Sequence, residues 1–138
     1  MRRFAALLTV VLLTACTNEI EQSTRPSSVA GTYELKAYGG KQLPVVVSTD
    51  GGAVTEVLSG ELVIGADNTW SESRTYRLTS GGSTQTASFV FSGSWTYVRE
   101  EAYMLFNLPS MAVQFTGTAA GGSVTLSMSD GSTVVYSH

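Results

Sequence analysis

The sequence predicts an all-β protein that folds as an eight-stranded antiparallel up-and-down barrel. Its composition favours strands, because Thr, Ser, Val, Tyr and Gly are abundant and only 14% of the residues are charged. From residue 30 onward, apolar and polar residues alternate in short runs separated by turn-forming residues, which is typical of half-buried strands. The turns are too short for parallel crossovers, which need a dozen or more residues. Closing the sheet buries its apolar face and removes its edges, so we expect a barrel, with a sandwich as the alternative.

The first expected strand covers residues 31–38, where Glu34 and Lys36 alternate with apolar residues. The apolar segment 43–47 contains Pro44, which cannot donate a hydrogen bond inside a sheet. We therefore expect this segment to form a covering loop or an edge.

The second strand is expected at 53–66, with a bulge or bend at Gly60. A tight turn at 67–68 leads into the third strand, at 69–79. In the fourth strand, at 86–98, alternate aromatic residues share one face.

The fifth strand, at 102–108, stops near Pro109. In the sixth strand, at 111–119, we expect Met111, Val113 and Phe115 to lie on one face. The last two strands are expected at 123–129 and 133–138, joined by a hairpin at Asp130-Gly131.

The N-terminus carries a secretory signal. Arg2 and Arg3 precede an apolar run at 4–15, which is shorter than the ~20 residues needed to span a bilayer. The chain's only cysteine, Cys16, follows this run.

Residues 13–16 (LTAC) resemble the lipobox of bacterial lipoproteins. The resemblance implies that a diacylglycerol is attached to the Cys16 thiol, that the chain is cleaved before Cys16, and that the new amine is acylated. The alternative is an ordinary cysteine at the end of a signal peptide. By the sorting pattern of the same family, Thr17 favours the outer membrane, facing the periplasm, over the inner membrane.

Three segments are therefore expected: a signal peptide at 1–15, a lipidated cysteine with a flexible tether at 16–29, and a barrel domain at 30–138. The tether is polar and has no hydrophobic face.

The barrel domain resembles small bacterial lipocalin-like (calycin-type) lipoproteins. It begins with Tyr33 where true lipocalins have Trp, and it is shorter than they are. Whether the interior is filled by side chains or holds a pocket stays open. The motifs that carry the resemblance are 31–35 (GTYEL), 39–44 (GGKQLP), 60–64 (GELVI), 67–70 (DNTW) and 91–97 (FSGSWTY).

Composition excludes several function classes. Without Arg2 and Arg3, six Lys and Arg stand against eleven Asp and Glu, a net charge of about −5. Such an acidic chain is a poor nucleic-acid binder. The single histidine, His138, is the last residue and is expected to fray, so neither a catalytic triad nor a zinc cluster is expected. We expect no catalytic residue, no metal and no cofactor, and do not expect an enzyme.

The third strand carries an unusual pattern. Trp70, Tyr76 and Leu78 share the parity expected to face inward, together with Glu72 and Arg74. The two charged residues either pair inside the barrel, as a ligand-orienting floor or a structural ion pair, or are turned to solvent by a bulge.

The expected function is a membrane-anchored envelope lipoprotein that binds a small apolar or amphipathic molecule. The alternative is a structural or interaction lipoprotein with a filled barrel, whose unknown protein partner contacts an apolar patch at Leu43 and 45–47. The candidate ligand-binding residues are Trp70, Glu72, Arg74, Tyr76, Trp95 and Tyr97.

Overall fold

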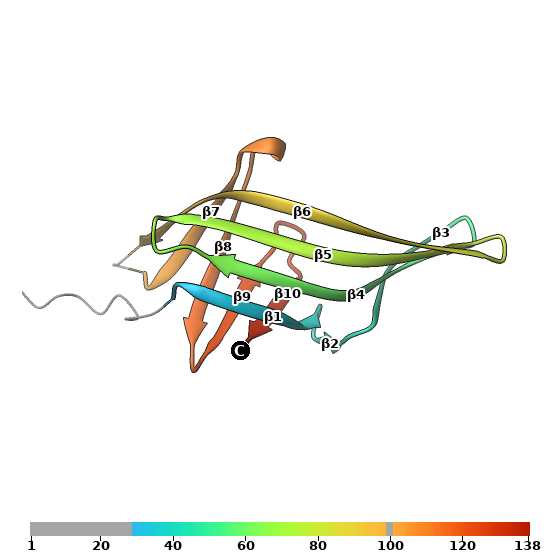
Figure 1. Ribbon diagram of the computed structural model, residues 1–138, viewed down its shortest axis with the longest axis horizontal. Coiled ribbons are helices and arrows are strands. Elements are labelled where there is room, and N and C mark those ends of the chain that lie inside the picture. Colours follow the sequence, from blue (N-terminus) through green and yellow to red (C-terminus); the bar gives the residue numbers. More distant parts are fainter. Residues whose placement is uncertain (1–28, 99–100) are drawn as a thin grey trace, which may run out of the picture.

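The protein is a closed antiparallel β-barrel with a sheet that projects from one end (Figure 1). The structure is a computed structural model and describes residues 29–98 and 101–138. Its elements are β1 (Gly31–Tyr38), β2 (Lys41–Gln42), β3 (Val45–Asp50), β4 (Ala53–Ile64), β5 (Thr69–Ser80), β6 (Ser83–Val98), β7 (Tyr103–Leu108), the 3₁₀ turn η1 (Pro109–Met111), β8 (Val113–Ala120), β9 (Ser123–Ser127) and β10 (Thr133–Ser137).

The barrel closes through its first strand. β1 pairs with β10 on one side and with β4 on the other, and the remaining strands follow in chain order. Eight strands, β1 and β4–β10, form the barrel, and every pairing is antiparallel. The predicted eight-stranded up-and-down barrel is confirmed, and its architecture is consistent with a lipocalin-like fold.

The segment with Pro44 supplies an edge, one of the two predicted alternatives. β3 begins at Val45 and pairs with β4 along its length. β2 adds a two-residue edge to β1. Both short strands lie outside the closed ring.

Two strands start two or three residues away from the predicted positions, and β4 and β9 each end two residues earlier than predicted, at Ile64 and Ser127. The sequence predicts a sixth strand that starts at residue 111, but Pro109–Met111 form a 3₁₀ turn and β8 starts at Val113. Pro109 has no N–H to donate to a sheet ladder, and its fixed φ suits the first turn of a helix. The fourth strand starts at Ser83 rather than 86, which makes β6 the longest strand, with 16 residues.

A bulge in β4 marks the point where this strand enters the barrel. The register with β5 shifts between Val57 and Ser59, just before the position predicted. Up to Val57, β4 pairs with β3, and from Glu61 it pairs with β1. At Gly60 the backbones are so close that a Cβ atom would lie 2.9 Å from the Ser73 carbonyl oxygen.

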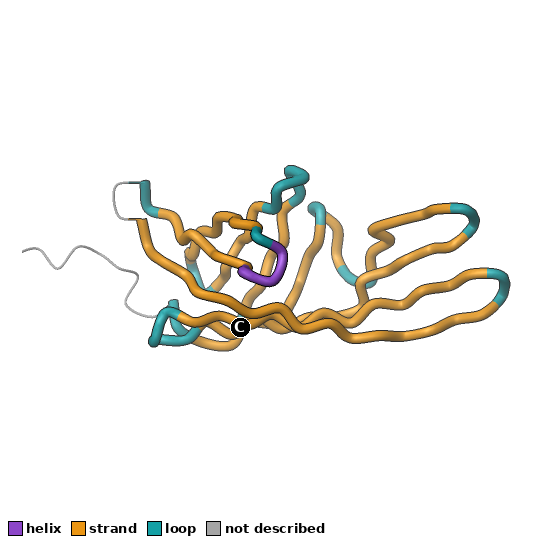
Figure 2. Tube along the Cα trace, turned by 90° about the horizontal axis from the view of Figure 1, so that it is seen from above, coloured by secondary structure: helices purple, strands orange, loops and turns teal. Residues whose placement is uncertain are grey.

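The two ends of the barrel differ. At the closed end, Tyr33, Trp95 and Phe106 are buried with aliphatic neighbours that fill the interior. Trp95 Nε1 donates to the Gly65 carbonyl (3.1 Å), and the Tyr33 hydroxyl donates to the Val29 carbonyl (2.8 Å). The open end carries η1, the β9–β10 turn and the projecting sheet (Figure 2).

The projecting sheet comprises residues 45–57 of the β3–β4 hairpin and 75–90 of the β5–β6 hairpin. Both hairpins run past the barrel at the same end (Figure 2). In β6, residues 83–90 are all exposed, and Phe89 and Val90 are 53% and 71% exposed. Leu78 also lies in the projecting sheet and is 42% exposed, so the prediction that it faces inward is wrong. At this position β5 extends beyond the barrel, whose other strands would otherwise cover the side chain.

Candidate functional site

Strand β5 carries the polar floor of the candidate site. Its register with β6 is unbroken from Thr69 opposite Ser94 to Ser80 opposite Ser83, so no bulge turns its middle to solvent. Alternate side chains of a strand share a face. Trp70, Glu72 and Arg74 are therefore all buried inside the barrel.

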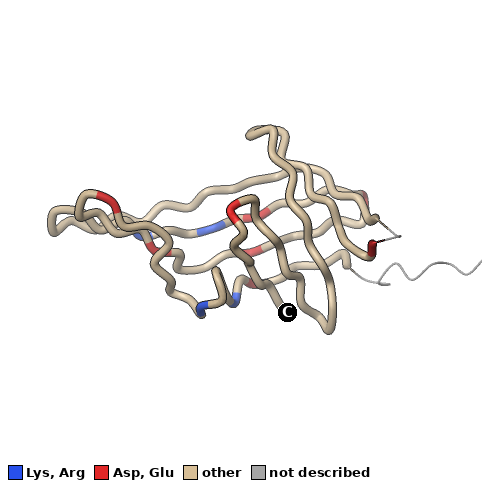
Figure 3. The backbone as a smooth tube through the Cα atoms, turned by 180° about the vertical axis from the view of Figure 1, so that it is seen from behind, with Lys and Arg blue, Asp and Glu red and all other residues tan. Residues whose placement is uncertain are grey.

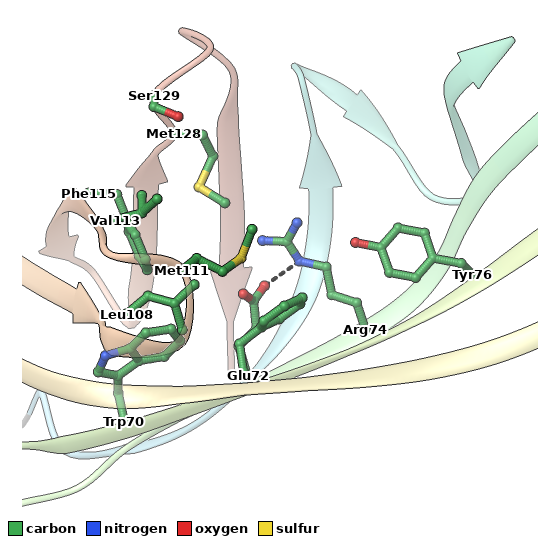
Figure 4. A pocket seen from close by; sticks show the side chains of 11 residues that line it. Trp70, Glu72, Arg74, Tyr76, Leu108, Met111, Val113, Phe115, Met128 and Ser129 are labelled. Atoms are coloured by element: carbon green, nitrogen blue, oxygen red, sulfur yellow. Dashed lines mark hydrogen bonds and ion pairs between the residues drawn. The ribbon is translucent and has the colours of Figure 1, made fainter. Parts of the chain in front are cut away.

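Glu72 and Arg74 form an ion pair in the interior (Figure 4). Arg74 Nε donates to Glu72 Oε1, and the two side chains are 5% and 3% exposed. The Tyr136 hydroxyl of β10 donates to the same carboxylate oxygen. This resolves the choice left open by the sequence in favour of pairing over exposure.

Burial dominates the electrostatics of this pair. Desolvation raises the pKa of Glu72 above its ordinary value, against the pull of the Arg74 charge and hydrogen bond. Desolvation alone would lower the pKa of Arg74, but Glu72 and the nearby Tyr76 hydroxyl raise it. Each charge of the pair therefore depends on its partner.

The guanidinium of Arg74 is not fully satisfied. Its Nη2 atom is buried and donates to no acceptor among the described residues. Its Cζ atom lies 5.3 Å from the centre of the Tyr38 ring, a cation–π distance. Because buried polar groups are nearly always hydrogen-bonded, this unused donor requires an explanation.

The pair lies at an open cavity of about 220 Å³ (Figure 4). The cavity wall is mostly apolar and comes from β5–β8, η1 and the end of β9. Its lining residues are Trp70, Glu72, Arg74, Tyr76, Phe91, Leu108, Met111, Val113, Phe115, Met128 and Ser129.

A second hollow of about 420 Å³ follows the projecting sheet. It shares Tyr76 and Phe91 with the first, so the two adjoin. Leu78 and Phe89 line its outer part, and the rings of Tyr76 and Phe89 meet edge to face at 5.8 Å. An elongated apolar surface therefore leads from the barrel interior out along the sheet.

The structure brings four of the six sequence-predicted residues together. Trp70, Glu72, Arg74 and Tyr76 line the cavity. Trp95 and Tyr97 lie further along β6, toward the closed end, and are not among its lining residues.

Sequence reasoning missed the opposite wall of the cavity. The sequence predicts a common face for Met111, Val113 and Phe115, and this shared face is the signal that could have identified them. Leu108 and Met128 gave no such signal, because they reach the cavity from the ends of strands that only the barrel closure brings near β5.

Two further expectations have different outcomes. His138 is not frayed: its ring stacks on Tyr33 with centroids 4.3 Å apart, and Nδ1 lies 3.0 Å from the Thr32 carbonyl oxygen. Cys16, with the signal and tether predicted around it, lies outside the described residues.

The apolar patch predicted at Leu43 and 45–47 is smaller than expected. Val45 is buried, Leu43 and Val47 are partly buried, and only Val46 is strongly exposed. The larger exposed apolar side chains lie on the β5–β6 hairpin and at Met111 instead.

Charges are sparse along the described chain (Figure 3). Within residues 29–98 and 101–138, no three His, Cys, Asp or Glu side chains gather as a metal site would require. No helix in the same part of the chain has the length and apolar character to cross a membrane.

Comparison with known proteins assigns the chain to no family. No family model matches the chain, and neither a curated protein nor a solved structure matches it.

Proposed function

We propose that this protein is a lipid-anchored lipoprotein of the bacterial cell envelope whose barrel binds a small apolar or amphipathic molecule at its open end. The observation that carries the binding proposal is the apolar cavity with the Glu72–Arg74 pair in its floor. Ligand sites are commonly concave, mostly apolar and furnished with a few polar groups. The protein acts as a binder rather than an enzyme, without metal or cofactor, and has no nucleic-acid partner.

The cavity is small for a drug-sized ligand, since pockets for such ligands occupy about 300–1,000 Å³. It adjoins the larger hollow along the projecting sheet. An elongated molecule therefore fits better than a compact one, with one end in the barrel and the remainder along Leu78 and Phe89.

The anchor proposal rests on the lipobox-like residues 13–16. Lipid chains on Cys16 would hold the protein at the membrane, because each buried CH₂ contributes ~0.8 kcal/mol. The described chain begins at Val29, whose carbonyl accepts from Tyr33 at the closed end. The open end then lies at the opposite side of the barrel from the point where the tether joins it. Cys16→Ser should abolish lipid labelling and signal cleavage, and an unmodified Cys16 in membrane-extracted wild-type protein would contradict the anchor.

Binding is tested with N-phenyl-1-naphthylamine, an uncharged probe whose fluorescence rises in apolar surroundings. The wild-type protein should give a saturable rise. Val113→Trp, which fills the cavity, should abolish it. Gln114→Trp is the matched control, because Gln114 is exposed on the opposite face of β8, and should leave the titration unchanged. Equal binding by the wild-type protein and both variants would contradict the proposed site.

A second candidate function is an interaction lipoprotein, and one observation favours it. β6 pairs with β5 from Ser83 to Ser94, but it pairs with β7 only from Ser94 onward. Its segment 83–92 contains no charge or proline and pairs on one side only among the described strands. A free, uncharged edge can accept a strand from a partner. Val90→Lys should then abolish partner capture while leaving probe binding intact, because Val90 lies outside the residues that line the cavity.

A further inference from the structure

We infer that the cavity selects an amphipathic molecule whose polar end is an uncharged oxygen group, such as a hydroxyl or an ester, over one that ends in a carboxylate. This inference rests on the proposed binding function. It is carried by the incomplete hydrogen bonding of Arg74 together with the charge compensation by Glu72.

The first step is the unused donor. Arg74 lines the cavity and is 95% buried, and its Nη2 atom donates to nothing among the described residues. An arginine guanidinium carries five N–H donors and no acceptor. The group that would complete this site is therefore an acceptor oxygen.

The second step is access to that donor. Tyr76 lies beside the guanidinium on the open side (Figure 4) and is only half-buried. Side chains with solvent exposure change rotamer rapidly. An incoming molecule can therefore displace Tyr76 more easily than a packed core residue.

The third step is charge. Glu72 already compensates Arg74, so the floor of the cavity is neutral as a pair. A carboxylate ligand would bring a second anion beside Glu72, where low polarity strengthens the repulsion. A hydroxyl avoids that repulsion, because it accepts from Arg74 and donates to a carboxylate.

The fourth step is the tail. Beyond the ion pair, the lining residues of the cavity are apolar or aromatic except for Ser129, and they include Met111 and Met128. Methionine side chains are flexible and adapt to irregular apolar groups. The walls therefore suit an alkyl chain without dictating its shape.

The test compares ligands of equal chain length, 1-decanol and decanoate, as competitors of N-phenyl-1-naphthylamine. Wild-type protein should bind decanol at least tenfold more tightly than decanoate. Glu72→Gln keeps the side-chain shape and an acceptor for Tyr136 but leaves Arg74 uncompensated. This variant should shift the decanol-to-decanoate affinity ratio at least tenfold toward decanoate.

The matched control is Glu56→Gln. Glu56 pairs with Arg77 on the other face of the same sheet, with an Nε–Oε2 distance of 2.7 Å. It lies outside the cavity lining, so the ratio should not change. If Glu72→Gln does not fold, the relative affinities of the wild-type protein for decanol and decanoate alone test the inference.

Three outcomes separate the inference from the function. If the probe binds but the decanol-to-decanoate affinity ratio of Glu72→Gln equals that of the wild type, the inference is wrong and the proposed binding function is unaffected. A wild-type preference for decanoate also overturns it. Absence of probe and ligand binding overturns the proposed function itself.

Discussion

Arg74 donates its Nε hydrogen to Glu72, its neighbour two residues back on β5, and both side chains point into the barrel. Three residues further along, Arg77 reaches across to Glu56 on the outer face, where the side chains are 39% and 20% exposed. Strand β5 therefore supplies the arginines of two Arg–Glu pairs, one buried within the barrel and one that reaches Glu56 of β4 on the outer face. Buried and exposed pairs differ in energy, so each serves as a control for the other.

The inner pair should show strong energetic coupling. Arg74→Met should lower the free energy of unfolding by about 3–5 kcal/mol, because it leaves a buried carboxylate without a partner. In a Glu72→Gln background the same substitution should cost far less. Urea denaturation of the two single variants and the double variant measures the difference.

The outer pair supplies the control for that cycle. Arg77→Met with Glu56→Gln should give little coupling, because solvent screens exposed charges. Additive effects at the inner pair, equal to those at the outer one, would mean that Glu72 and Arg74 are not a buried charged pair.

Glu72 should make stability depend on pH in the direction opposite to an ordinary paired carboxylate. Burial raises its folded-state pKa above the ordinary value of 4.5, so between the two values the folded state binds more protons than the unfolded state. Its contribution to stability is therefore complete below pH 4.5 and is lost as the pH rises through the folded-state pKa.

The comparison of wild type with Glu72→Gln isolates this contribution, since the other carboxylates are common to both. The stability of wild type relative to the variant should fall as the pH rises from 4 to 8. A relative stability that climbs over this range would show that Arg74 lowers the pKa of Glu72 instead.

Two tyrosine hydroxyls should contribute different amounts to the free energy of unfolding, because one donates to a charged acceptor and the other to a neutral one. Tyr136 donates to the Glu72 carboxylate, whereas Tyr33 donates to the Val29 carbonyl. Hydrogen bonds to charged groups contribute about 1.5–3 kcal/mol and neutral ones about 0.5–1.5 kcal/mol. Tyr136→Phe should therefore destabilise more than Tyr33→Phe in thermal melts, and the reverse order would contradict the assigned contacts.

Gly93 should tolerate no side chain. A Cβ atom there would lie 1.8 Å from the Asn107 carbonyl oxygen and 3.0 Å from Trp70 Nε1. Because the backbone carbonyl of Asn107 cannot easily move away, Gly93→Ala should lower the free energy of unfolding by about 1–3 kcal/mol. Ser92→Ala, at the exposed neighbouring position, should change the melting temperature little. Equal melting temperatures for the two variants would refute the close approach of β6 and β7.

Alternation of apolar and polar residues predicted the strands of this fold because each barrel strand has one covered face. The same alternation continues through Leu78 and Phe89, where the strands have left the barrel and nothing described covers them. The alternation of apolar and polar residues does not indicate how far a hairpin extends beyond the barrel, so the projecting sheet could not be predicted.

The candidate site was predictable on β5 and not elsewhere. Parity alone placed Glu72 and Arg74 on the inner face. Their environment depends on Tyr136, which is 64 residues away from Glu72 and reaches it only through barrel closure. The sequence alone therefore left both pairing inside the barrel and exposure through a bulge open.

The most direct test of ligand binding at the open end is methyl NMR of protein labelled at the methionine methyl groups. Met111 and Met128 line the cavity, whereas Met104 is 1% exposed on β7, opposite Tyr97 near the closed end. On titration with 1-decanol, the Met111 and Met128 signals should shift and saturate together while Met104 stays in place. Signals from Met111 and Met128 that do not move, or a Met104 shift as large as theirs, would contradict binding at the open end.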